Sequence, residues 1–287
     1  MKPSQFDYAK PNSVEEIFDL LARYGDDARL LAGGQSLLPS LNMRLSAPTM
    51  LIDLTAQDAL RGIVIGDGVL RIGALTTYAE VQASAEVARA APLLSQAIPW
   101  IAHPAIRNRG TIGGSLSHAD PAAEMPACML ALDAQLEIAA KGGRRRIAAA
   151  DFFRGLFETD LRPGEILTAI EVPVIQAGYR SGFSEFSRRL GDFAISGLAA
   201  HARFDGEVLS DVRLAYCGVD TRPVRARLTE QVLKGRSFGS VTLAEAKAAL
   251  AKDLSPPDDL QATGQMKLLL SQVLMERVLT AMARADG

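Results

Sequence analysis

Two pairs of adjacent glycines, each followed by a serine hydroxyl, are the residues of this sequence best suited to holding an anion. They lie in residues 32–36 (AGGQS) and 111–115 (TIGGS). Because glycine lacks a β-carbon, such a turn can take positive φ and lets a bulky group approach its N–H groups. Oriented N–H dipoles bind phosphate without a lysine, and a diphosphate has two phosphoryl groups. The pair predicts two backbone cups for a diphosphate-bearing ligand, with ordinary glycine turns between elements as the alternative.

Carboxylates follow the second glycine motif and indicate a sugar-binding role. Asp120 and Glu124 could accept hydrogen bonds from sugar hydroxyls. Neither glycine motif matches the dinucleotide pattern GxGxxG or the phosphate loop GxxxxGK[ST]. Only Cys128 and Cys217 are present, which excludes a disulfide framework and an iron–sulfur cluster with four ligands from this chain. The three histidines lack metal-ligand spacing, so we expect no metal site. We also find no acid–base or nucleophile constellation, hence no catalytic residue, and any redox centre must be imported.

Composition is that of an ordinary globular enzyme. Of the 287 residues 48% are hydrophobic and 22% charged, and 31 basic side chains balance 33 acidic ones to a net charge of −2. This balance argues against a nucleic-acid partner. No stretch approaches the ~20 apolar residues of a membrane span, and the N-terminus lacks the apolar core of a signal peptide. We expect a cytoplasmic protein.

Local patterns predict the elements that position the first glycine motif. Ser13 and Glu16 form a predicted capping box at the start of a helix that Gly25 ends. A strand (28–34), a helix (36–45) and a second strand (50–54) then predict a β–turn–α–β unit around the motif. The sequence also predicts a hairpin at 62–74 and a helix at 76–98 that is capped by Thr76 or Thr77.

The second glycine motif leads into a predicted helix at 121–134, followed by strands at 135–140, 144–149 and 165–173. The pattern then changes near residues 175–178. Strand-like runs at 183–189, 196–204 and 208–219 precede three helical segments, the last of which begins at Gly264. We therefore expect a C-terminal lobe in which a small antiparallel sheet carries helices.

Taken in order, four segments resemble a known family. They are AGGQSLLP, IRNRGTIGGS with DPAAEMPA, EILTAIEVP and FSRRLGDFAISGLAA. Their sequence resembles the flavin-binding medium subunit of the molybdenum hydroxylases, the carbon monoxide dehydrogenase and xanthine dehydrogenase group. The resemblance implies an α+β fold: a vanillyl-alcohol-oxidase (PCMH)-type FAD-binding domain over 1–176, with subdomains of about 1–56 and 57–176, and a small C-terminal domain over 177–287.

The same resemblance implies FAD as cofactor and assigns its contacts. The first loop would be Ala32, Gly33, Gly34, Gln35 and Ser36, the second Thr111, Ile112, Gly113, Gly114 and Ser115, with Glu124 on the ribose, the backbone of Leu167 on the flavin, and Glu185. Three residues depart from the family pattern. Gln35 replaces a common histidine, Ser115 replaces the usual asparagine, and Glu185 replaces a lysine that contacts FAD. For Glu185 we expect either compensation by Arg188 or Arg189, or a side chain that turns away.

The resemblance also implies partners and a role. A large subunit with a molybdenum cofactor would oxidise the substrate, and a small subunit with two [2Fe–2S] clusters would relay electrons to FAD on this chain and so to an external acceptor. The resemblance further implies a dimer of heterotrimers. Two alternatives stay open: a free-standing FAD-dependent oxidase or dehydrogenase of the same fold, and a flavin-free scaffold. The sequence names neither the substrate nor the acceptor.

Overall fold

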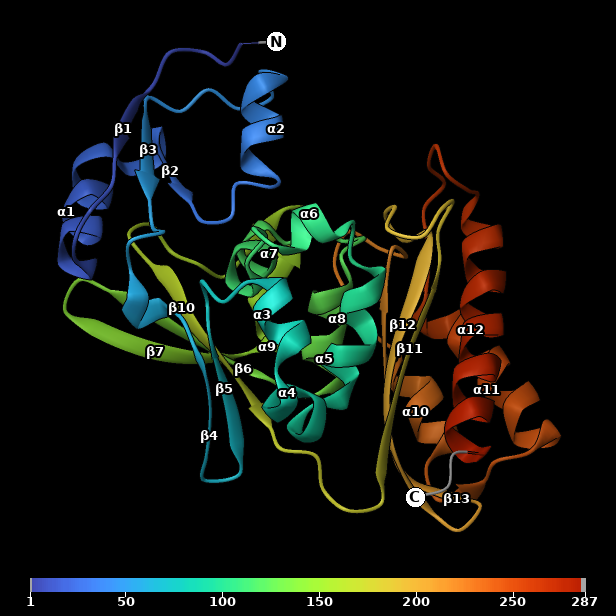
Figure 1. Cartoon of the computed structure of the whole chain (residues 1–287). Helices are drawn as coiled ribbons and strands as arrows, with labels where there is room; N and C mark the ends of the chain where they lie inside the picture. Colours follow the sequence, from blue (N-terminus) through green and yellow to red (C-terminus); the bar gives the residue numbers. More distant parts are fainter. Residues whose placement is uncertain (1, 285–287) are drawn as a thin grey trace.

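A computed structural model describes residues 2–284 and shows three larger sheets and a two-stranded one, with helices around and between them (Figure 1). The N-terminal part, blue in Figure 1, is a parallel sheet in the order β1-β3-β2 with two helices beside it. The predicted β–turn–α–β unit is confirmed, because β2 and β3 pair in parallel and α2 lies between them in the chain. The elements are β1 (Asp7–Ala9), α1 (Val14–Tyr24), η1 (Gly25–Asp27), β2 (Ala28–Leu31), α2 (Leu37–Asn42) and β3 (Met50–Asp53).

Helix α1 begins and ends where its sequence predicts. The Ser13 hydroxyl accepts the Glu16 N–H at 3.2 Å, and Gly25 with φ 49° follows the last turn. The Glu16 carboxylate accepts from the N–H of Asn12, one residue before the cap, rather than from Ser13. In a complete capping box the Glu16 carboxylate would accept from the N–H of Ser13. Here that second hydrogen bond comes from the residue before it.

The central sheet is antiparallel in the order β4-β5-β10-β6-β7. It contains the hairpin predicted at 62–74, and the strands predicted at 135–140 and 144–149 pair in it as a second hairpin. Helices cover the face of this sheet that packs into the largest cluster of buried hydrophobic side chains, which we call the main core. The elements are η2 (Asp58–Leu60), β4 (Ile63–Gly66), β5 (Val69–Gly73), α3 (Tyr78–Ala83), α4 (Ala85–Ala90), α5 (Pro92–Ala97), η3 (Ile98–Trp100), α6 (Pro104–Arg107), α7 (Ile112–His118), α8 (Glu124–Ala131), β6 (Gln135–Ala140), β7 (Gly143–Ala148), α9 (Ala149–Phe152), β8 (Phe153–Gly155), β9 (Glu158–Thr159) and β10 (Ile166–Pro173).

The single helix predicted over 76–98 is wrong: three short helices, α3, α4 and α5, replace it. Thr77 starts α3 with a complete capping box. The Ser84 hydroxyl then accepts the N–H of Val87 and starts α4, and Pro92, which has no N–H, starts α5. Serine and proline in the middle of an apolar pattern therefore divide the predicted helix into three.

The C-terminal part is the predicted antiparallel sheet with helices. Its order is β11-β12-β13-β14, and β15 pairs with β13. Helices α5 and α8 lie on the face toward the central sheet, and α12 covers the opposite face (Figure 1). The first strand lies four residues earlier than predicted. The elements are β11 (Tyr179–Phe186), β12 (Ser196–Asp205), β13 (Val208–Cys217), β14 (Val224–Arg225), α10 (Arg227–Leu233), β15 (Arg236–Ser237), α11 (Ser240–Asp253) and α12 (Gly264–Arg284).

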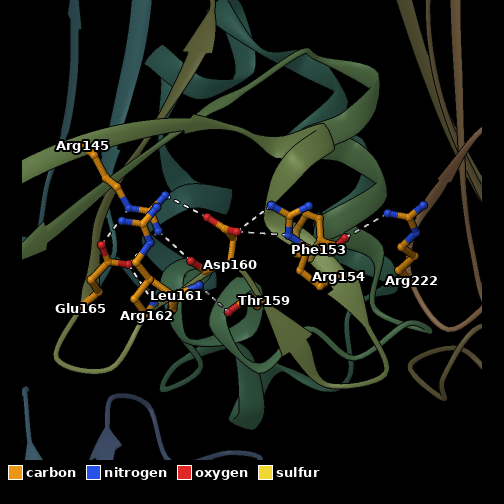
Figure 2. A network of polar contacts seen from close by, with 9 residues as sticks. All are labelled: Arg145, Phe153, Arg154, Thr159, Asp160, Leu161, Arg162, Glu165 and Arg222. Atoms are coloured by element: carbon orange, nitrogen blue, oxygen red, sulfur yellow. Dashed lines mark hydrogen bonds and ion pairs between the residues drawn. The ribbon is translucent and has the colours of Figure 1, made fainter.

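A polar network fixes the segment that leads into β10 (Figure 2). Arg145 on β7 donates to both carboxylate oxygens of Glu165, at 2.8 and 2.7 Å, and to the Asp160 carboxylate at 2.9 Å. Arg154 binds the same aspartate, and Arg222 of the C-terminal part donates to the Phe153 carbonyl oxygen. The edge strand, the β8–β9 hairpin and the C-terminal part are thereby tied together. No helix within residues 2–284 is both long and apolar enough to cross a membrane.

Candidate cofactor-binding site

The first glycine motif is an open backbone loop between β2 and α2. Gly34 has φ +74°, a conformation that favours glycine, and the Gln35 side chain donates to the Gly33 carbonyl at 2.8 Å. In the part of the chain that the structure describes, the N–H groups of Gly33, Gly34, Gln35 and Ser36 donate to no protein acceptor. Since four consecutive amides without an acceptor favour an anion, this loop has the properties of the predicted cup.

The second glycine motif is not a loop. Thr111 is the N-cap of α7, and Gly113 and Gly114 are helical residues without positive φ. The amides of α7's first turn are already used: the N–H of Gly113 donates to the Ala74 carbonyl and that of Gly114 to the Thr111 hydroxyl. The expectation of a second backbone cup is therefore wrong. A β-carbon on Gly113 would lie 2.4 Å from the Ala74 β-carbon, so this glycine lets α7 lie directly on the end of β5.

The two motifs nevertheless lie side by side. A β-carbon on Gly33 would lie 2.1 Å from the carbonyl oxygen of Arg109, and one on Gly114 would lie 3.5 Å from the Ala32 side chain. The open loop therefore rests on the backbone that leads into α7. This close contact, rather than positive φ, explains the first glycine of AGGQS.

Glu124 is the first residue of α8 and faces the protein interior. It is 7% exposed, and its carboxylate accepts no hydrogen bond from another side chain within residues 2–284. Burial raises its pKa to about 7, with Asp120 contributing in the same direction. Asp120 itself accepts the Ala122 N–H at 2.9 Å, so its carboxylate is used within the turn before α8. Glu124 is thus a buried acceptor to which no other residue of the described chain donates a hydrogen bond.

Glu185 on β11 is buried as well, with 5% exposure, and neither of its carboxylate oxygens has a hydrogen-bond partner in the described chain. Burial and then the charge of Glu124 raise its pKa to about 8. The expected compensation by Arg188 or Arg189 is wrong. The Arg188 guanidinium donates to the Leu260 carbonyl, Arg189 is exposed without an ion pair to Glu185 in residues 2–284, and the glutamate does not turn to solvent.

The register of the C-terminal sheet explains this placement. Glu185 pairs with Gly197 across the β11–β12 ladder, and Gly197 pairs with Cys217 on β13. The Cys217 side chain belongs to the main core, so the face that these three residues share is turned toward α8. Strand alternation therefore carries Glu185 inward, to the side of Glu124.

Tyr78 is a site residue that sequence reasoning missed. It is 4% exposed, its hydroxyl lies beside Ser115, and it also faces Glu124. Its ring would lie 3.6 Å from a β-carbon on Gly110, next to the Gln35 side chain. Tyr78 thus links the two glycine motifs to the buried carboxylates. Only the preceding cap residue Thr77 marks it in the sequence, and a cap does not indicate a site.

Leu167 lies on β10, paired with Ile138, and is 6% exposed. The ladder with β5 reaches only to Ala169, and the ladder with β6 is irregular between Leu167 and Ala169. Its side chain belongs to the main core. Within residues 2–284, no three His, Cys, Asp or Glu side chains are arranged to hold a metal ion.

These features fit FAD. The free amides of residues 33–36 suit a diphosphate, and the unused carboxylate of Glu124 suits a sugar hydroxyl. The fit comes from one open loop and one buried acceptor, with α7 as the packed support behind them.

Comparison with known proteins agrees. Residues 4–175 match the FAD binding domain in molybdopterin dehydrogenase, and residues 181–282 match the CO dehydrogenase flavoprotein C-terminal domain. The 6-hydroxypseudooxynicotine dehydrogenase complex subunit alpha of Paenarthrobacter nicotinovorans is 40% identical over 97% of this chain and 95% of its own length. The carbon monoxide dehydrogenase medium chain of Hydrogenophaga pseudoflava is 34% identical over 98% of each protein.

The fold of this chain also matches solved structures over nearly its whole length. A carbon monoxide dehydrogenase chain from Hydrogenophaga pseudoflava superposes with a TM-score of 0.96 at 36% identity and covers 98% of both chains. The predicted α+β, PCMH-type fold with a C-terminal domain is confirmed. By fold, by both sequence matches and by the cofactor that its open loop suits, this chain belongs to the FAD-binding medium subunits of the molybdenum hydroxylases.

Proposed function

We propose that this chain is the FAD-carrying electron-transfer subunit of a molybdenum hydroxylase complex. It receives electrons from the [2Fe–2S] clusters of a small partner subunit and delivers them to an external acceptor. The observation that carries the proposal is the run of four amides at residues 33–36 without a protein acceptor. Relatives over nearly the whole chain include a dehydrogenase complex subunit and a carbon monoxide dehydrogenase medium chain.

The residues of this chain hold and orient the cofactor. The amides of residues 33–36 bind the diphosphate, Glu124 accepts a ribose hydroxyl, and α7 supports the loop from behind. Thr111, Ser115 and the backbone of Leu167 complete the proposed contacts, and Ile112 fixes α7 through its N–H to the Thr76 carbonyl. When bound, FAD supplies the electron-accepting chemistry, and the protein supplies its binding and environment.

The partners are a large subunit with a molybdenum cofactor and a small iron–sulfur subunit, in a dimer of heterotrimers. We further propose a cytoplasmic location. The division into a FAD-binding domain (1–176, with subdomains of about 1–56 and 57–176) and a C-terminal domain (177–287) is supported by the two family matches, which end at 175 and begin at 181.

Purification with and without the partner subunits tests this function. We expect the full chain to bind FAD and absorb near ~450 nm, and to co-elute with both partners when they are present. Turnover of a substrate by the full chain alone would favour the free-standing oxidase or dehydrogenase. A colourless chain that takes up no FAD would contradict the proposal and favour the scaffold.

A further inference from the structure

Lys267 is a buried lysine outside the residues assigned to the cofactor so far. It lies in the first turn of α12 and is 3% exposed. Its ammonium group donates to the Asp259 carboxylate at 2.6 Å and to the Gly218 carbonyl oxygen at 3.1 Å. Because a buried ion pair brings little net stability, the second hydrogen bond, to Gly218, is the contact that needs an explanation.

Gly218 lies in the turn after β13 and forms hydrogen bonds on both sides of its Cα atom. Its carbonyl oxygen accepts from Lys267, and its N–H donates to the carbonyl oxygen of Pro121 at 2.8 Å. The residue has φ +77°, and a β-carbon on it would lie 2.7 Å from the Ala194 carbonyl oxygen, so this turn requires glycine. Gly218 thus connects α12 to the segment that leads into α8.

Pro121 belongs to the turn after which Glu124 begins α8. Asp120 closes this turn, because its carboxylate accepts the N–H of Ala122 at 2.9 Å and its carbonyl oxygen accepts that of Ala123 at 3.1 Å. The turn is therefore one hydrogen-bonded unit, and a shift of Pro121 also shifts Glu124. Since no other residue of the described chain donates to the Glu124 carboxylate, the backbone of the turn sets where this carboxylate lies.

Two serines fix α12 at the place where Lys267 reaches Gly218. The Ser271 hydroxyl, one turn along the helix, donates to the Lys267 carbonyl oxygen at 2.8 Å. It also lies 2.8 Å from the Ser196 hydroxyl at the start of β12, and both serines are fully buried. Helix α12 covers β11 and β12 (Figure 1), so the lysine extends from a packed helix rather than from a loop.

We propose that Lys267 is a positioning residue for FAD. Acting through the backbone of Gly218, it holds the turn that presents the Glu124 carboxylate to a ribose hydroxyl of the cofactor. A residue of the C-terminal part thereby contributes to cofactor binding without touching the cofactor. The statement about FAD rests on the proposed contact between Glu124 and the ribose, whereas the hold on the turn does not.

A double-mutant cycle in the full chain tests this route. Lys267→Met keeps an unbranched apolar stem but donates no hydrogen bond, and Glu124→Gln removes the charge of the acceptor. We expect each substitution to raise the Kd for FAD about tenfold, as for one charge-assisted hydrogen bond. In a chain that already carries Glu124→Gln, Lys267→Met should add less than about twofold, because both act on the same contact. Independent losses that multiply to about a hundredfold would overturn the inference.

Two control variants separate the hold on the turn from general stability. Lys247→Met removes another lysine of the C-terminal part, which pairs with Glu276 between α11 and α12. Asp259→Asn weakens the ion pair but leaves the hydrogen bond to Gly218. Both should change the Kd for FAD by less than about twofold, even where the Tm falls. If Asp259→Asn weakened FAD binding as much as Lys267→Met, the ion pair would be the active contact and the inference would be wrong.

Hydrogen exchange in the FAD-free chain gives a readout that needs no cofactor. The Gly218 N–H donates to Pro121, so its exchange reports on the hold. We expect Lys267→Met to speed this exchange at least about tenfold and Lys247→Met to leave it unchanged. Unchanged exchange in Lys267→Met would overturn the inference. If that variant does not fold, Lys267→Gln, which is shorter but keeps a donor, replaces it in both measurements. Failure of the unchanged chain to bind FAD would instead contradict the proposed function, and the exchange would still decide the hold.

Discussion

Replacing Gly113 by alanine tests whether the second glycine motif serves the fold or the cofactor. The added β-carbon would lie 2.4 Å from the Ala74 β-carbon and 2.6 Å from its carbonyl oxygen, whereas carbon atoms in contact are about 3.5–4 Å apart. Much of the obstacle is backbone, so α7 must move off β5. We therefore expect the substitution to destabilise the chain before it affects FAD.

The magnitude follows from two opposing effects. Overpacking a tight core costs about 1–3 kcal/mol, and replacing a helical glycine by alanine returns at most about 1 kcal/mol. A net loss of about 1–2 kcal/mol in the free energy of unfolding corresponds to a fall in Tm of about 2–8 °C for a protein of this size.

The assay is thermal unfolding of the FAD-free chain together with FAD bound per folded chain. Gly143→Ala is the control, because a β-carbon there meets nothing within 4 Å, and we expect less than about 0.5 kcal/mol of change. Gly34→Ala should show the opposite balance: φ +74° costs about 1 kcal/mol, while the displaced amides weaken FAD binding. The reasoning is refuted if Gly113→Ala loses FAD while its Tm equals that of Gly143→Ala, since that result would make the glycine a cofactor contact.

Four further outcomes are expected. Asp133→Asn removes an ion pair with an arginine of β13 and another with one of β14, so urea unfolding should show a loss of about 1 kcal/mol that shrinks in high salt; a loss independent of salt would contradict this. Arg145→Ala should cost about 2 kcal/mol at neutral pH, because it leaves the half-buried Glu165 with only the Arg162 N–H as a hydrogen-bond donor. Arg145 lowers the pKa of Glu165, so this stability is present above the unfolded value of 4.5 and is lost as pH falls through the folded one; acid titration of both chains should therefore converge, and parallel curves would refute the pairing. Glu185→Lys should bind FAD more tightly than the unchanged chain, most clearly at low salt, and weaker binding would contradict a position near the cofactor. Metal analysis of the isolated chain should find neither iron nor molybdenum, and stoichiometric iron would refute an imported redox centre.

Local chemistry was sufficient to predict much of the fold. The Ser13 and Thr77 caps, the glycine hairpins and the alternation of the C-terminal strands depend on neighbours in the chain, and the structure has each of them. The form of the second glycine motif depends on Ala74, which lies nearly forty residues earlier. Two glycines after a threonine suit a loop and a helix start equally, and the contact with β5 decides for the helix.

The residues of the site could be predicted where they depend on local sequence, and not where they depend on contacts between distant segments. The open loop at residues 33–36 follows from its own glycines. The burial of Glu185 on the side of Glu124 requires α8 to lie on the C-terminal sheet in one register, and no pattern in either segment contains that information. The predicted compensation by Arg188 or Arg189 failed because neighbours along a strand or the following turn point elsewhere.

Helix α8 has a consequence for how this protein folds. All eight of its residues, Glu124 to Ala131, are buried between the central sheet and the C-terminal one. Both halves therefore bury apolar surface against the same helix. Separating the halves would expose both of the faces that α8 covers. We therefore expect the two halves to unfold in one cooperative transition despite their separate family matches. Recombining halves from different relatives should succeed only when α8 and the strands it covers are exchanged together.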